Sequence, residues 1–158
     1  MTIRQLGGKA SGFIASDYRG RRRAHKRLRV GLLILTLSAA YPGIWALIAP
    51  KSFFTDFPGL GFEWVSLLGT YNEHLVRDVG GFYLGFALLL VAATITLSHV
   101  LTISALIAWL GFSIPHLIFH LAHLDGLETS DAVGQTVTLG ITVLLPLYLL
   151  TQLRKSEH

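Results

Sequence analysis

The sequence contains no cysteine among its 158 residues, and only 14% of the residues are charged. Without cysteine the chain can form no disulfide, no thiolate metal site and no cysteine nucleophile. Soluble domains usually carry about 25% charged residues, so the low value indicates a protein that does not face water over most of its surface. The motifs of P-loop proteins, dinucleotide-binding domains, serine hydrolases and helical zinc proteases are also missing. These absences exclude the enzyme classes that such motifs define.

Four apolar runs are each close to the length that crosses a bilayer as a helix, which is about 20 residues. They cover about residues 30–50, 79–100, 101–124 and 132–153. Backbone groups in hydrocarbon must bond to each other, and none of the runs alternates polar and apolar residues, so helices are expected rather than a membrane barrel. The predicted fold is therefore all-α, an integral membrane four-helix bundle formed by residues 30–153.

The basic residues are distributed unevenly, because nine of the thirteen Lys and Arg precede Val30. The segment RGRRRAHKRLR, residues 19–29, comes directly before the first apolar run, and two more basic residues follow the last run. Positively charged flanks stay on the cytoplasmic side, so the N and C termini are both predicted to be cytoplasmic. Residues 1–29 and 154–158 are accordingly expected to be cytoplasmic tails. The basic segment is expected to contact anionic lipid of the bilayer, and no nucleic acid.

The connection between the first two runs, residues 51–71, is expected on the outer side and is rich in aromatic residues. Its segment SFFTDFPGLGFEW suits the boundary between headgroups and hydrocarbon, where aromatic rings are enriched. Two interpretations are open. The segment is either an aromatic belt at the membrane surface or a cover over a site beneath it.

The start of the second run, YNEHLVRDVGGFYLG (residues 71–85), concentrates ionisable residues at a membrane boundary. Side chains four residues apart share one helix face, so Glu73 is expected to pair with Arg77, and His74 to lie above Asp78. One interpretation is a polar helix start that is capped by an asparagine or threonine side chain. The other assigns catalytic roles to Glu73, Arg77 and Asp78, with the guanidinium holding an anionic group of the substrate.

The third run ends in GFSIPHLIFHLAHLD, whose histidines His116, His120 and His123 form a stripe along an otherwise apolar helix. Ionisable residues inside a membrane segment are costly and are functional by default. The second run begins on the outer side and the third ends there, so this stripe and residues 73–78 are expected at similar depth. Gln135, near the start of the fourth run, can reach the same region.

Imidazole and carboxylate ligands together suit a divalent transition metal, either Zn, Fe, Mn or Cu. His116 and His123 stand about 10 Å apart along a helix axis, so one ion is expected to use His120 with only one of them. His74 or a carboxylate would complete the ligand set, and the predicted metal ligands are therefore His74, His116, His120 and His123. A bis-histidine haem is disfavoured, because neighbouring histidines of one helix cannot approach the iron from opposite faces.

The leading hypothesis is a His/carboxylate site near the outer leaflet that binds a divalent transition metal and acts on a lipid-soluble substrate. Such a protein would be a metal-dependent membrane enzyme, either an oxidoreductase or a hydrolase. The alternatives are a metal-free acid–base or proton/quinone-relay site, and a non-catalytic accessory or structural subunit of a membrane complex. Gly81 and Gly85 have the spacing that lets helices approach closely, so a homo-oligomer or a membrane-protein partner is compatible with the sequence.

The segments YNEHLVRDVGGFYLG and PHLIFHLAHLDG resemble those of small four-helix membrane proteins of actinobacteria, which are loosely similar to the DoxX-like proteins. The resemblance covers roughly residues 30–153. It implies a bacterial plasma membrane and a four-helix fold, and it implies no reaction, cofactor or site residue.

Overall fold

The computed structural model describes the backbone of residues 3–156 and the side chains of residues 20–153. Four long helices dominate it, namely α1 (Ile3–Ile48), α3 (Glu73–Thr96), α4 (His99–Leu121) and α5 (Thr129–Ser156). Each of them contains a stretch that is long and apolar enough to cross a membrane. The prediction of a helical bundle with four helices of membrane-spanning length is confirmed.

The helices begin earlier than the apolar runs of the sequence suggest. The basic segment, for which the sequence predicts only a tail, is helical and continuous with the first span in α1. Lysine and arginine are good helix formers, so this segment can extend the span without a break. The side chain of Asn72 caps α3 by accepting a hydrogen bond from the backbone N–H of Leu75 at 3.1 Å. This confirms the predicted asparagine cap.

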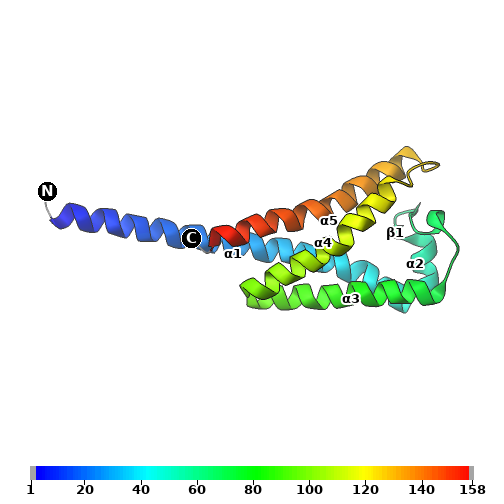
Figure 1. The fold of residues 1–158 in the computed structure, drawn as a ribbon, viewed down its shortest axis with the longest axis horizontal. Coiled ribbons are helices and arrows are strands. Elements are labelled where there is room, and N and C mark those ends of the chain that lie inside the picture. The colour runs from blue at the N-terminus through cyan, green and yellow to red at the C-terminus, as the bar shows by residue number, and fades with distance from the viewer. Residues whose placement is uncertain (1–2, 157–158) are drawn as a thin grey trace.

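The long helices form two antiparallel pairs (Figure 1). α1 packs mainly against α3, α4 packs mainly against α5, and contacts between α1 and α5 join the two pairs. α3 and α4 are consecutive in the chain, yet they contact each other less, because the α4–α5 pair diverges from the α1–α3 pair toward one end of the bundle (Figure 1). The C-terminus lies at the other end, beside α1.

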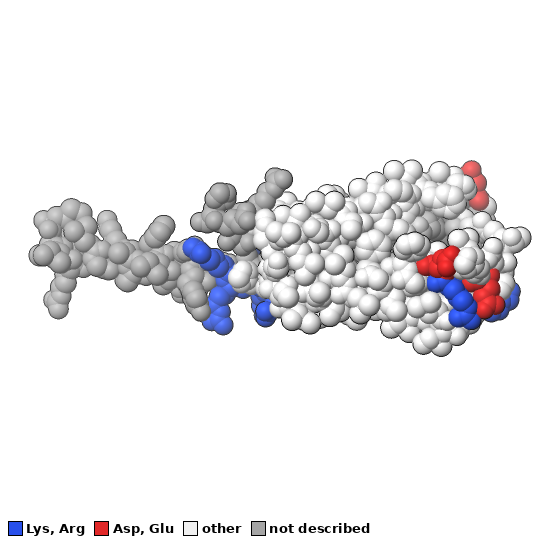
Figure 2. Space-filling view, turned by 60° about the horizontal axis from the view of Figure 1, so that its bottom comes forward, with Lys and Arg blue, Asp and Glu red and all other residues white. Residues whose placement is uncertain are grey.

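Charged side chains gather at the two ends of the molecule on the face that Figure 2 shows, with a broad uncharged band between them. The sequence has no Asp, Glu, Lys or Arg between Asp78 and Asp125, or between Asp131 and Arg154. One end carries residues 19–29 and is named the basic end here, and the opposite end, with the connections α1–α3 and α4–α5, is named the loop end. An uncharged band between charged ends is the surface expected of a chain that crosses a bilayer.

The main hydrophobic core lies in the half of the bundle nearer the basic end. On α1 its buried residues are Leu28, Leu32, Leu35 and Ala39, at the three- and four-residue spacing of one helix face. The other three long helices contribute leucine and alanine side chains, together with Trp109 of α4. A second and smaller cluster lies at the loop end, so the two ends of the bundle are packed separately.

The connection between α1 and α3 is an ordered aromatic cap. It consists of α2 (Pro50–Asp56), the antiparallel strands β1 (Pro58–Gly59) and β2 (Phe62–Glu63), and the 3-10 helix η1 (Ser66–Leu68). Aromatic rings pack on one another beneath it, with the centroids of Phe53 and Phe57 4.8 Å apart and those of Trp45 and Phe57 6.1 Å apart. The cap therefore has a small core of its own at the loop end.

Trp109 ties α4 to α5 by a hydrogen bond inside the main core. Pro146 of α5 has no N–H, so the carbonyl group of Thr142, four residues earlier, lacks a partner in its own helix. The indole Nε1 of Trp109 donates to that carbonyl oxygen at 2.8 Å. A side chain of the neighbouring helix thus compensates for the proline and holds the two helices together.

α1 and α3 touch backbone to backbone where Gly43 meets Gly80. A Cβ atom placed on Gly43 would lie 2.9 Å from the backbone nitrogen of Leu84 and 3.2 Å from the carbonyl oxygen of Gly80. Gly81 and Gly85, whose spacing predicts a helix contact, have no neighbouring atom of the described residues within 4 Å of such a Cβ. Successive helix residues are turned by about 100°, which directs Gly80 to α1 and Gly81 away from it.

Replacing Gly43 with alanine is expected to destabilise the protein, whereas the same change at Gly81 should be tolerated. Alanine exceeds glycine in helix propensity by about 1 kcal/mol, so a net loss at Gly43 must come from overpacking of the α1–α3 contact, which costs roughly 1–3 kcal/mol. Thermal unfolding in detergent, followed by circular dichroism, measures both variants. Equal unfolding midpoints for Gly43→Ala and Gly81→Ala would contradict the close contact.

Candidate functional site

The ion pairs predicted at the start of α3 form within that helix. Arg77 Nη2 lies 2.9 Å from Glu73 Oε1, and His74 Nε2 lies 3.4 Å from Asp78 Oδ2. Arg77 also donates through Nη1 to the carbonyl oxygen of Leu47 at 2.6 Å. Leu47 belongs to the last turn of α1, whose carbonyl groups lack partners within the helix. Arg77 therefore caps α1 and ties it to α3.

The histidine stripe of α4 separates into a pair and a single residue. The rings of His116 and His120 meet edge to face with centroids 4.6 Å apart, and Phe112 stacks on His116 at 5.2 Å. His123 instead stacks on Phe119 at 4.1 Å, and its Nδ1 donates to the Phe119 carbonyl oxygen at 2.7 Å. His116 and His120, named the histidine pair below, thus face each other, while the ring of His123 is held by its own helix.

Gln135 of α5 joins the histidine pair from the facing helix. Its Oε1 lies 2.8 Å from Nδ1 of His120. A carboxamide oxygen can only accept, so Nδ1 of His120 carries a proton and donates it to this bond. In the neutral form of the ring, Nε2 is then the nitrogen with the lone pair. Gln135 is only 1% exposed, and no described residue bonds to its Nε2 amide group. A fully buried amide donor is therefore available beside the histidine pair.

Ser113, one turn before the histidine pair on α4, provides a second polar group that no described residue bonds. Its side chain is 2% exposed. Hydroxyl groups in helices commonly bond to the carbonyl four residues earlier, as Thr36 does at 2.8 Å and Thr94 at 2.7 Å. Thr102, nearer the basic end, is the other described buried hydroxyl that does not. Ser113 differs from Thr102 in lying next to His116.

The aromatic cap covers the start of α5 directly beside Gln135. Trp64 Nε1 donates to Asp131 Oδ1 at 2.8 Å. The ring of Trp64 lies against Gly134, where an added Cβ would come within 2.9 Å of it. Both contacts support the interpretation that residues 51–71 cover a site, since the residue after Gly134 is the one that binds His120.

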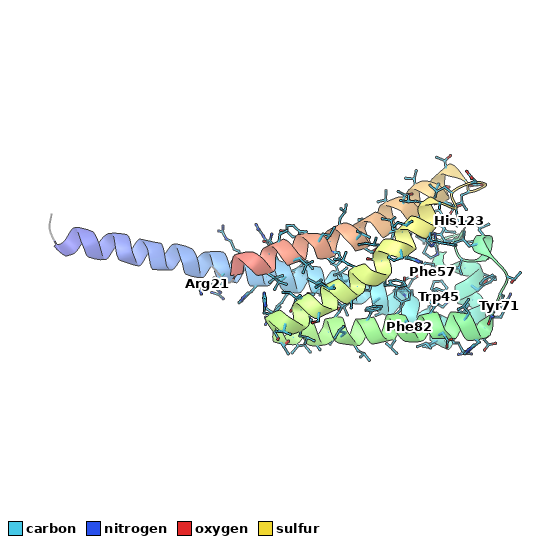
Figure 3. All side chains as sticks on the ribbon, viewed as in Figure 1. Arg21, Trp45, Phe57, Tyr71, Phe82 and His123 are labelled. Carbon is cyan, nitrogen blue, oxygen red and sulfur yellow. The ribbon has the colours of Figure 1, made fainter. Side chains whose placement is uncertain are left out.

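The ionisable side chains of α3 lie at the same end of the molecule as the histidine stripe but on another side of it. In the view of Figure 3, Tyr71, the residue two positions before α3, lies below His123 at the loop end. Among the residues whose side chains are described, no group of three or more His, Asp and Glu is placed to hold a metal ion. The metal role predicted for His74 and the catalytic roles predicted for its neighbours on α3 stay predictions.

An open groove of about 700 Å³ runs along α3 and is named the α3 groove. It is lined by Arg77, Asp78, Gly81, Phe82, Gly85, Phe86 and Leu89. The two glycines leave room for it, and Phe82 is 73% exposed beside them (Figure 3). The Phe86 ring lies 5.9 Å from that of Phe112, which in turn stacks on His116. Two aromatic rings thus connect the groove to the histidine pair.

Comparison of the chain with protein-family models, with characterised proteins and with solved structures finds no match. The resemblance to actinobacterial and DoxX-like proteins therefore stays a prediction, as does the bacterial plasma membrane that it implies. The chemistry of the site rests on the geometry of its own residues.

The hydrogen bond between His120 and Gln135 is expected to couple the stabilities of α4 and α5. In a cycle of His120→Ala, Gln135→Ala and the double variant, the coupling free energy should be roughly 0.5–2 kcal/mol, as for other hydrogen bonds between membrane helices. Unfolding in mixtures of detergent and SDS measures the three variants. A cycle of His123→Ala with Gln135→Ala is the control, because His123 bonds to its own helix, and its coupling should be close to zero. Equal couplings in the two cycles would contradict the bond.

Proposed function

We propose that the protein is a multi-pass membrane protein that binds a divalent transition metal at His116 and His120 and acts there on a lipid-soluble substrate. The observation that carries the proposal is a pair of imidazole rings in a membrane-length helix, one of them oriented by Gln135. Histidines that bind metals usually donate their other ring N–H to an oxygen, which fixes the ring and leaves one nitrogen for the ion. His120 has this arrangement.

The histidine pair supplies two nitrogen ligands to the proposed ion. Histidines four residues apart on a helix can both reach one ion, and imidazole suits Zn, Fe and Cu, whereas Mn prefers oxygen ligands. The other coordination positions would be filled by water or by an oxygen of the substrate, since open positions distinguish catalytic from structural sites. The hydroxyl of Ser113 and the amide of Gln135, which no described residue bonds, would bond to that water or oxygen.

The composition of the α3 groove favours a substrate that enters from the bilayer. Most of its wall is apolar, whereas its loop end carries Arg77 and Asp78. An elongated apolar molecule in this groove would place its polar end at these two side chains. Arg77 would hold an anionic or carbonyl group, and Asp78 would take or give a proton. Glu73, which pairs with Arg77 at 2.9 Å, would keep the guanidinium in position.

We also propose that the histidine pair faces the outer leaflet of a bacterial plasma membrane. Basic flanks stay in the cytoplasm, and nine of the thirteen Lys and Arg precede Val30 at the basic end. His116 and His120 lie in the second half of α4, which leads toward the loop end (Figure 1). The charge distribution therefore favours an outward-facing site.

Wild-type protein that is incubated with Zn, Fe, Mn or Cu and then desalted is expected to retain about one ion per chain. His116→Ala and His120→Ala should lose it, because each removes one of two nitrogen ligands. Mass spectrometry with an inductively coupled plasma measures the metal content of tag-free protein in detergent. His123→Ala is the matched control and should keep the metal, since the His123 ring is held by Phe119.

A wild type that retains none of the four metals would contradict the metal site. That result would favour a second candidate, a metal-free proton-transfer site. The unpartnered groups of Ser113 and Gln135 suit the oxygen of a carbonyl or quinone as well as a metal-bound water, and His120 Nε2 would act as the base. Full metal retention in His116→Ala and His120→Ala would instead place the metal elsewhere.

Filling the α3 groove is expected to protect His116 from lipid-soluble reagents. Gly85→Leu puts a side chain where no atom of the described residues lies within 4 Å of a Cβ. Labelling by diethyl pyrocarbonate, which reacts with neutral imidazole, is followed residue by residue with mass spectrometry. His116 should be labelled several-fold more slowly in the variant, while exposed His74 is unaffected. Gly140→Leu on α5 is the control, and an unchanged His116 rate in Gly85→Leu would contradict this route.

A further inference from the structure

A second groove lies between α1 and α5 at the basic end, at the opposite end of the bundle from the aromatic cap. Its volume is about 360 Å³, and it is named the α1–α5 groove. Three cationic side chains line one part of it, namely Arg23, Lys26 and Arg27. None of the three has an ion-pair or hydrogen-bond partner among the residues whose side chains are described. Their charge is therefore available to a ligand.

The α1 side of this groove changes from cationic to apolar along a single helix face. Arg23, Arg27, Val30 and Ile34 follow one another at three- and four-residue spacing and all line the groove. Eleven residues of helix separate the first from the last, which corresponds to about 16 Å. A phospholipid has the same arrangement, a charged headgroup followed by an apolar acyl chain of similar length.

α5 forms the other wall of the groove through Leu145, Tyr148 and Leu149. Gly31 lets this wall approach α1, because a Cβ placed on Gly31 would lie 2.5 Å from Cδ2 of Leu149. Tyr148 is 44% exposed, and tyrosine is enriched at the level of lipid headgroups. The apolar part of the groove is thus walled by both helices, next to the cationic part on α1.

We infer that the α1–α5 groove binds one anionic phospholipid, with its phosphate between Arg23 and Arg27 and an acyl chain along Val30, Ile34 and Leu145. Guanidinium groups bind phosphate through paired, charge-assisted hydrogen bonds. A soluble anion would use only the cationic part, whereas a lipid also covers the apolar part. The site lies where the basic end meets the uncharged band (Figure 2), which is where a headgroup meets hydrocarbon.

Native mass spectrometry of the full-length, delipidated protein in mild detergent tests this site. The probes are phosphatidylglycerol and phosphatidylcholine with identical acyl chains. The wild type should bind one phosphatidylglycerol about tenfold more tightly than phosphatidylcholine, and Arg23→Gln/Arg27→Gln should weaken that binding about 25-fold, since each basic residue near an anionic lipid contributes about fivefold. Arg22→Gln/Arg29→Gln is the matched control, because it removes the same charge from the same segment outside the groove, and it should weaken the binding several-fold less than the groove variant does.

Three outcomes would overturn the inference. Equal losses in the two double variants would show that only the net charge of the segment matters. Equal affinity for phosphatidylcholine would show that no anionic headgroup is recognised. Displacement of bound phosphatidylglycerol by inorganic phosphate at millimolar concentration would assign the cationic part to a soluble anion. All four substituted side chains are exposed. The unfolding temperature of each double variant is measured beside the wild type, so that affinities are compared between folded proteins.

Discussion

A polar side chain inside a bilayer has no water to bond and must find its partners within the protein. Thr36 meets this constraint through a carbonyl of its own helix, and Trp109 meets it through the carbonyl that Pro146 leaves free. Ser113 and Gln135 each keep one polar group that no described residue bonds. Both lie beside the histidine pair, whereas Thr102, the third described residue of this kind, lies nearer the basic end. Two of the three unbonded groups therefore occur where the chemistry is predicted.

The arrangement of the helices determines which groups meet at that place. Gly43 and Gly80 hold α1 to α3, and the bond from Trp109 to the Thr142 carbonyl holds α4 to α5. These contacts hold the two helices of each pair together, and the two pairs diverge from each other toward the loop end (Figure 1). Packing of α4 against α5 brings His120 to Gln135. The α3 groove stays open on the other pair, with the rings of Phe86 and Phe112 between it and the histidine pair. The aromatic cap then covers the start of α5 through Trp64.

Local features of the fold follow from the sequence, whereas its lateral arrangement does not. Composition predicts four long apolar helices, and four-residue spacing predicts the pairs Glu73–Arg77 and His74–Asp78. The structure has these four helices and both pairs. The order of the predicted spans puts the histidines and the α3 carboxylates at the same depth in the membrane, and both lie at the loop end. Depth does not specify which helices are neighbours, and α4 faces α5 rather than the start of α3. The role of Gly80 rather than Gly81 likewise depends on which helix face meets α1.

The protonation of His120 tests the proposed site most directly. Nitrogen-15 NMR of histidine-labelled protein in lipid bilayers, with His120→Ala to assign the signals, distinguishes the two ring nitrogens. The bond to Gln135 Oε1 predicts a proton on Nδ1, and the proposed metal site requires a bare Nε2 whose signal shifts when zinc is added. A proton on Nε2 would mean that the Gln135 amide donates to Nδ1. His120 would then have no lone pair for a metal, which would contradict the proposal.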